Sequence, residues 1–196
     1  MSYTNGLDKP SDYFETILYS GNGSTQSITS LDFQPDWCWL KARAGANVSN
    51  HRSVDSVRGA TKELFQDATA AEETNTNGLT AFNSNGFSLG SSGGTNNSNT
   101  TYASWNWKAG TSFSNDASST SIGSIDSTGS VNTTSGFSVI TFTGDGNANA
   151  TVAHGLGVAP KMVIVKSRSA ATGWFVYHAS LTTGDNIYLN DSGAAF

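Results

Sequence analysis

Short runs in which apolar and polar residues alternate recur along the chain, and Gly, Asn and Ser separate them. Runs of this kind bounded by turn residues are typical of β-strands. In the first part of the chain they predict strands at residues 14–19, 28–33, 35–43, 79–82, 86–89 and 102–107, with two more within 54–65. So many short strands in so few residues are typical of a β-sandwich.

One strand pattern occurs twice. Residues 35–43 (PDWCWLKAR) return as residues 160–168 (PKMVIVKSR), each with a proline at the start and Lys-x-Arg at the end. Upstream, residues 14–23 match residues 137–146, with Phe14, Ile17, Gly21 and Gly23 repeated at a spacing of 123. The proline strands repeat at a spacing of 125. Because solenoid repeats are only about 20–50 residues long, this period indicates a duplicated domain.

Within the first proline strand, Trp37 and Trp39 share one face, and Cys38 and Leu40 share the other. Both faces are apolar, which favours a central strand that is covered on both sides. We therefore expect Trp39→Ala to remove a core side chain and to be among the most damaging substitutions. Trp105 and Trp107 have the same spacing of two, which also favours core packing.

The pattern divides the chain into four parts: an N-terminal extended arm (1–12), a first β-sandwich domain (13–109), a Ser/Thr-rich linker or extended segment (110–135) and a second repeat (136–196). The second repeat lacks counterparts of residues 86–89 and 102–107. The expected fold is all-β, with two related β-sandwich domains (jelly-roll or concanavalin-like) in tandem, the second incomplete. Its missing strands would come from a neighbouring subunit or from a continuation beyond Phe196.

Composition narrows the possible functions. Charged residues make up 13% of the chain, the net charge is −5, and the ten basic residues are dispersed. Without a basic cluster, nucleic-acid binding is disfavoured. No apolar run approaches the ~18 residues that a membrane-spanning helix needs, so we expect no membrane insertion. The single cysteine, Cys38, excludes an intramolecular disulfide.

The sequence offers no catalytic constellation. His51, His154 and His178 do not belong to a set with metal-ligand spacing, and no nucleophile motif is present. We therefore expect no enzyme activity, no catalytic or metal-binding residue and no cofactor. Exposed tryptophans suit the flat faces of sugar rings, and Trp174 is the candidate contact for a glycan.

Six apolar residues are candidates for contacts with other proteins. Tyr3, Leu7 and Tyr13 would anchor the N-terminal arm on a partner, although a frayed terminus is an equally simple reading. Ile122, Ile125 and Val131 are spaced along the Ser/Thr-rich segment. As part of an extended stretch they would lie against a neighbouring surface, whereas a flexible linker would leave them without a fixed contact.

The repeat motifs also carry a resemblance. Residues 136–146, 154–168 (HGLGVAPKMVIVKSR) and 174–178, with 7–14 and 55–59 as companions in the first copy, resemble a repeated β domain of large virion proteins of tailed, especially marine, bacteriophages. The first copy has residues 29–32 (TSLD) in place of His-Gly-Leu-Gly, so any role of His154 would belong to one domain.

The resemblance implies a non-enzymatic structural protein of the virion, assembled in the host cytoplasm: the virion-proximal part of a tail fibre or spike. By family analogy we expect self-association as a homotrimer. The residues of the arm and the tryptophans lead us to expect contacts with other virion proteins through the arm and contact with a host-surface glycan. The alternatives are a capsid decoration protein and a stand-alone carbohydrate-binding module.

Overall fold

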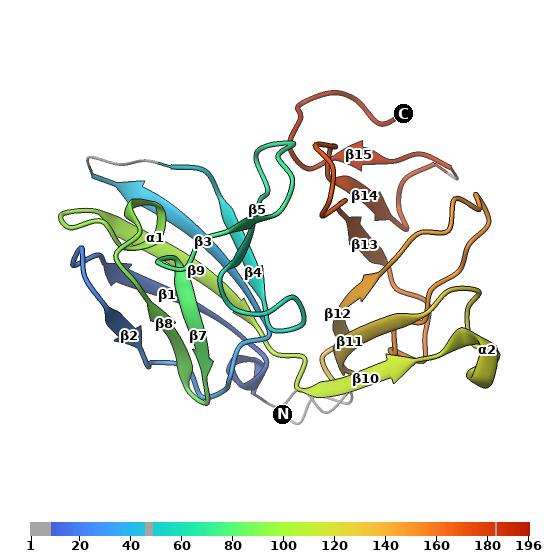
Figure 1. The fold of residues 1–196 in the computed structure, drawn as a ribbon, viewed down its shortest axis with the longest axis horizontal. Helices are drawn as coiled ribbons and strands as arrows, with labels where there is room; N and C mark the ends of the chain where they lie inside the picture. Colours follow the sequence, from blue (N-terminus) through green and yellow to red (C-terminus); the bar gives the residue numbers. More distant parts are fainter. Residues whose placement is uncertain (1–8, 46–48, 183) are drawn as a thin grey trace.

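The computed structural model describes residues 9–45, 49–182 and 184–196. The all-β prediction is confirmed, since 40% of the chain is strand and 6% is helix, and the strands form several antiparallel sheets (Figure 1). Among the described residues, no helix has the length and apolar character needed to cross a bilayer.

Two sheets of the first half pack face to face (Figure 1). The larger sheet has the order β1-β9-β3-β4-β5-β6 and the smaller sheet β2-β8-β7. The strands of the larger sheet are β1 (Phe14–Ser20), β9 (Thr101–Trp107), β3 (Trp37–Ala44), β4 (Arg52–Asp55), β5 (Lys62–Phe65) and β6 (Glu73–Thr74). The smaller sheet comprises β2 (Gln26–Ile28), β8 (Gly86–Leu89) and β7 (Leu79–Asn83). A short 3-10 helix, η1 (Pro10–Asp12), precedes β1, and a helix of one turn, α1 (Gly93–Asn96), precedes β9.

The core between these sheets follows the strand alternation. It is built from the buried residues Ile17, Ile28, Leu31, Phe33, Cys38, Leu40, Val54, Leu79, Phe87 and Leu89. Strands were expected across residues 28–33, but β2 ends at Ile28. Leu31 and Phe33 reach the core from the loop before β3 instead. The other strands expected in this half are confirmed.

The tryptophan prediction was wrong in one respect. Trp37 and Trp39 do lie opposite Cys38 and Leu40, but the core uses the Cys38 face. The registers pair Trp37 with Trp107 and Trp39 with Trp105, so all four indoles share the outer face of the large sheet, where each is half-buried. A spacing of two places residues on one face but does not say which face is buried, and here cysteine and leucine fill the core.

The Ser/Thr-rich segment is not a free linker. It forms β10 (Thr111–Asn115), the one-turn helix α2 (Ala117–Thr120) and β11 (Ser127–Asn132). These strands join β12 (Phe137–Phe142) in a three-stranded sheet with the order β10-β11-β12. Hydroxyl pairs such as Thr128 and Thr141, 3.0 Å apart, bridge neighbouring strands. The expected boundary at residues 135/136 therefore lies inside a sheet, and the arrangement as two tandem sandwiches stays a prediction.

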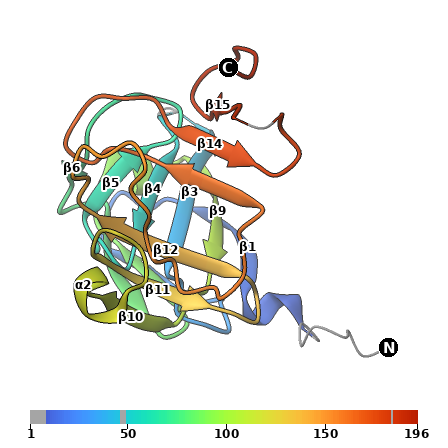
Figure 2. The same ribbon diagram turned by 90° about the vertical axis from the view of Figure 1, so that its right-hand side faces the viewer.

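The rest of the second copy forms another sheet. It contains β13 (Met162–Val165), β14 (Phe175–His178) and β15 (Ile187–Tyr188) in sequential antiparallel order. This repeats the order and direction of β3, β4 and β5 in the first half. Figures 1 and 2 place β12 and β13 as neighbouring strands of separate sheets.

The two halves are joined by specific polar contacts. The indole nitrogen of Trp174 donates to the Phe65 carbonyl (2.7 Å), and the Glu72 backbone nitrogen donates to the Arg168 carbonyl (2.8 Å). The Glu72 carboxylate also accepts bonds from Arg58 in the first half and Arg168 in the second, at 2.9–3.0 Å. Arg58 is buried and also pairs with Asp55. This charged network, in which Arg58 and Glu72 are largely buried and Arg168 is partly exposed, joins the segment between β13 and β14 to the loop after β5.

Candidate interaction surface

The outer face of the large sheet carries an aromatic cluster. The rings of Trp37 and Trp107 stack with centroids 4.3 Å apart, and Phe137 of β12 stacks on Trp37 at 6.0 Å. Trp39 meets Trp105 edge to face, and its indole nitrogen donates to His51 Nδ1 (2.8 Å). The aromatic faces of Trp37 and Trp107 thus contact rings of the same chain. This arrangement joins β12 to the large sheet.

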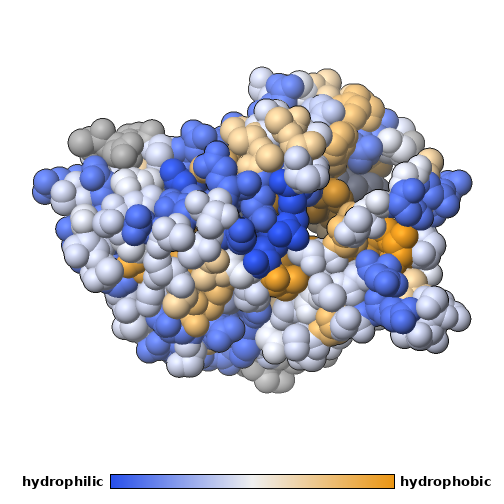
Figure 3. Space-filling view, viewed as in Figure 1, coloured by the Kyte–Doolittle hydropathy of each residue, from blue (hydrophilic) through white to orange (hydrophobic). Residues whose placement is uncertain are grey.

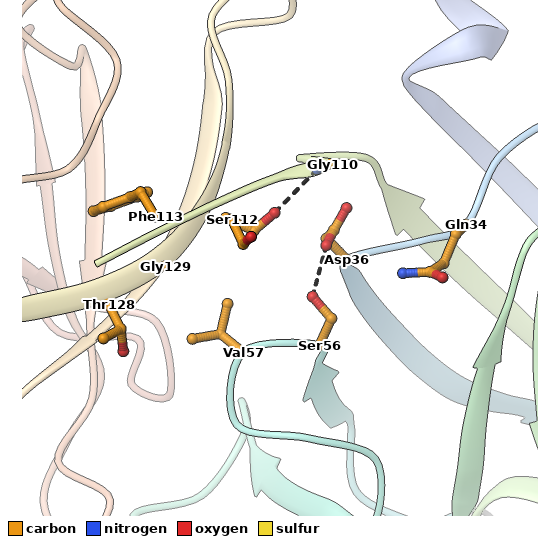
Figure 4. A pocket seen from close by; sticks show the side chains of 10 residues that line it. Gln34, Asp36, Ser56, Val57, Gly110, Ser112, Phe113, Thr128 and Gly129 are labelled. Carbon is orange, nitrogen blue, oxygen red and sulfur yellow. Dashed lines mark hydrogen bonds between the residues drawn. The ribbon is translucent and has the colours of Figure 1, made fainter. Parts of the chain in front are cut away.

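A groove of about 400 Å³ lies beside this cluster, where the first half meets β10 and β11 (Figure 4). Its lining residues are small or polar for the most part: Gln34, Asp36, Ser56, Val57, Gly110, Ser112, Phe113, Thr128, Gly129 and Ser130. The one carboxylate among them, that of Asp36, is buried. Its oxygens accept hydrogen bonds from the Ser56 hydroxyl (2.6 Å) and the Ala109 backbone nitrogen (2.8 Å). Asp36 therefore holds the chain at the junction and has no second acid or base as a catalytic partner in the groove.

Cys38 and His51 also have structural roles. Burial raises the pKa of the Cys38 thiol well above its ordinary value, aided by Asp36 and Asp55, so the thiolate is disfavoured. Burial lowers the pKa of His51, with Lys41 adding to the effect, which fits a neutral ring accepting from Trp39. Among the described residues, no three His, Cys, Asp or Glu side chains are grouped to hold a metal ion.

The six residues that were expected to contact other proteins do not share one environment. Tyr3 and Leu7 lie outside the described residues. Tyr13 is half-buried, with the Lys108 ammonium 5.9 Å from its ring centroid. Ile125 and Val131 are buried within the chain, so the expectation that they meet a partner was wrong. Ile125 forms a parallel bridge with Val152, and Val131 lies on the central strand β11, between β10 and β12, so both belong to the fold that the linker interpretation overlooked. Of the four candidates that the structure describes, only Ile122 is strongly exposed, at 58%.

Trp174 is likewise not a glycan contact. Its side chain is only 5% exposed, and its indole nitrogen is used by the Phe65 carbonyl. The residue lies one position before β14 and two positions before Val176, which is also buried. An indole in this position ties the C-terminal sheet to the first half.

The opposite face of the C-terminal sheet is apolar and uncovered. Its exposed residues are Val163, Val165, Phe175 and Tyr177, and apolar atoms gather over this part of the molecule at the upper right of Figure 3. The registers place Val163 beside Tyr177 and Val165 beside Phe175, so the four side chains form one patch. Phe196 extends it by stacking on Tyr188 (4.7 Å between centroids). A contiguous exposed apolar patch is typical of a protein interaction site.

The internal repeat explains why this face is apolar. With the prolines aligned, Val163 and Val165 correspond to Cys38 and Leu40, which are 0% exposed in the first half. Val163 and Val165 are 36% and 39% exposed. The patch is therefore the core face of the second copy without the layer that β2, β7 and β8 provide in the first. The repeat alignment, together with the missing counterparts, was the signal that could have identified these four residues from the sequence.

Comparison with known proteins adds the family. No curated protein and no solved structure shows a significant match to the chain. Residues 9–196, nearly the whole sequence, match one family, which is described as a domain of unknown function (DUF7483). That range includes both copies of the repeat, the groove and the uncovered sheet. The chain belongs to the DUF7483 family.

Proposed function

We propose that this protein is a structural subunit of a larger assembly and that it associates with other chains through the uncovered apolar face of β13, β14 and β15. The observation that carries the proposal is the exposure of Val163, Val165, Phe175 and Tyr177, whose counterparts in the first copy form or flank a closed core. Four large apolar side chains on one sheet face stabilise a complex when a partner removes them from water.

The resemblance of the repeat motifs supports a more specific proposal, a structural protein of a tailed-phage virion. In this proposal the chain is the virion-proximal part of a tail fibre or spike, it self-associates as a homotrimer, and it meets other virion proteins. Closed symmetry would hide the apolar face of every subunit. The low content of charged residues and the all-β fold agree with an exposed appendage.

Light scattering on the purified chain tests the association. The wild-type protein should have a mass larger than the 20.5 kDa of one chain, and three times that mass as a homotrimer. Tyr177→Lys places a charge on the apolar face and should shift the mass to that of a monomer. Leu18→Lys is the matched control, because Leu18 is even more exposed but lies on the first half. A wild-type monomer at all concentrations, or dissociation by the control alone, would contradict the proposal.

Antibody labelling of purified virions tests the location. Label on the tail appendages supports the fibre or spike, label on the capsid lattice alone favours a decoration protein, and virions without label would overturn a virion role. A glycan contact at Trp174 is not supported, because that indole is buried and donates to the Phe65 carbonyl.

A further inference from the structure

One difference between the two copies is the strand position of β9, which is filled in the first copy. In the first half, β9 lies between β1 and β3 and is antiparallel to both, over seven paired positions with β1 and seven with β3. The counterparts of β1 and β3 in the second copy are β12 and β13, as the repeats of Phe14 and of the proline strand show. Among the described strands, none pairs with the outer edge of β12 or of β13. The position that corresponds to β9 is vacant.

The two edges lie where one strand would continue both sheets. Figures 1 and 2 agree in showing β12 as the last strand of one sheet and β13 as the first strand of the next. A strand between them would complete the order β12-strand-β13-β14-β15, which is the order β1-β9-β3-β4-β5 of the first half.

The β13 edge also lacks some of the features that normally prevent strand addition. Natural sheet edges are protected by short strands, charged residues, proline or bulges. The β13 edge, Met162–Val165, is itself uncharged and without a bulge, although it is four residues long and lies between Lys161 and Lys166. An edge with free backbone N–H and C=O groups beside an apolar face is suited to β-augmentation, in which backbone hydrogen bonds give affinity and alternate side chains give specificity.

We infer that the β13 edge accepts a β-strand from a neighbouring chain of the assembly, antiparallel to β13 and with the side-chain pattern of β9. This inference rests on the proposed function, because it specifies how the uncovered sheet meets its partner. The chain's own β9 is fully paired inside the first half, so the incoming strand is a segment other than residues 101–107.

The first half gives the register of the incoming strand. There Trp107 pairs with Trp37, Trp105 with Trp39 and Ser104 with Leu40. In the second copy, the strand's two large aromatic residues would lie beside Met162 and Ile164. Its small residue would lie beside Val165, on the apolar face. The recognised partner is therefore an extended, uncharged segment with two large aromatic side chains on one face and, beside Val163 and Val165, an amide and a small side chain on the other.

Binding of a synthetic peptide tests the inference. The probe is a fluorescently labelled copy of residues 100–108 (TTYASWNWK), added to the full chain and followed by fluorescence anisotropy. A control peptide with Ser104→Pro lacks a backbone donor in mid-strand and cannot pair as a central strand. We expect saturable binding of the first peptide with one site per chain and no binding of the control.

Two protein variants show where the peptide binds. Val165→Asp should weaken binding by roughly tenfold or more, because the strand would bury an unpaired charge. Leu18→Asp, an equal change on an exposed residue of the first half, should leave binding unchanged. Circular dichroism of both variants checks that they fold. Failure of the wild-type chain to bind, or equal binding of both peptides or of both variants, would overturn the inference. If self-association nevertheless responded to Tyr177→Lys, the proposed function would stand and only the strand acceptor would be rejected.

Discussion

The same sequence pattern forms a closed core in one half of this protein and an open surface in the other. In the first copy, the apolar face of β3 and β4 is covered by the sheet of β2, β7 and β8. In the second copy, the corresponding face of β13 and β14 is exposed. A further pair shows the same contrast, since Phe33 is buried and its counterpart Val158 is exposed. The strand pattern thus determines which side chains share a face, whereas neighbouring segments determine whether that face is covered.

The two copies also use their equivalent sheet faces differently. The C-terminal sheet packs against the first half through the face of Trp174 and Val176. This face is opposite to the exposed face of Val163 and Val165. In the first copy, the face opposite to the core carries the tryptophans of β3. The second copy therefore uses its outer face for intramolecular contact and leaves its core face available.

The largest expected difference concerns matched core positions. Leu40→Ala removes a fully buried side chain and should lower the free energy of unfolding by about 2–5 kcal/mol. Val165→Ala, at the corresponding position of the second copy, should change it by about 0.5 kcal/mol in the monomer. Urea unfolding of both variants measures the two values. Equal losses would show that the second face is covered and would remove the contrast.

The next effect concerns the contact between the halves. Glu72→Gln removes the charge that joins Arg58 to Arg168 and should cost about 1–3 kcal/mol at pH 7. Arg58 keeps its bond to Asp55, which limits the loss. Arg168→Gln, at a more exposed partner, should cost about 1 kcal/mol or less. If neither variant loses stability, the C-terminal sheet is not fixed to the first half through this network.

The effect of Glu72 should depend on pH. Burial opposes its ionisation, but hydrogen bonds from Arg168 and Arg58 outweigh burial and hold the pKa of the carboxyl below 4.5. The stabilisation is thus complete above the unfolded-state pKa and is lost as the pH falls through the lower folded-state pKa. Urea unfolding at pH 7 and at pH 3 should show that the difference between wild type and Glu72→Gln decreases in acid.

The smallest effect concerns His51. The corresponding position in the C-terminal sheet is that of Trp174, which does not titrate. Because burial lowers the pKa of His51 below 6.5, the unfolded chain binds a proton at a higher pH than the folded chain. Stability should therefore fall as the pH drops below 6.5, by a small amount because the ring is partly exposed and solvent screens its charge. The His51→Gln variant should lack this component between pH 7 and pH 5.5. An identical pH dependence in both proteins would contradict the assignment.

Much of the fold was predictable from the sequence, and specific residues show why the rest was not. Alternation and turn residues located β7, β8 and β9, and the repeat located β13. The burial of Ile125 and Val131 was missed because few apolar residues interrupt their Ser/Thr-rich surroundings, although hydroxyl side chains pair well across strands. The position of Trp39 on the outer face was not predicted, because both faces of its strand carry apolar residues. Alternation alone does not show which of two such faces is buried.

From the sequence, the interaction surface was predictable only through the strands that the second copy lacks. Counterparts of β8 and β9 are missing from the second copy, which predicts an open core on one side. The residues that line the opening follow once Val163 and Val165 are aligned with Cys38 and Leu40. The contact that Trp174 makes with the Phe65 carbonyl was not predictable, because it joins segments that no local pattern relates.

Residue-resolved hydrogen exchange of the dilute, monomeric chain tests the central claim most directly. In β3, which has partners on both sides, the amides of Trp37–Leu40 should all exchange slowly. In β13, which has one partner, only alternate amides of Met162–Val165 should be protected. Adding the β9 peptide should protect the remaining amides of β13. Uniform protection of β13 in the monomer without peptide would contradict the claim that the second copy has a vacant strand position.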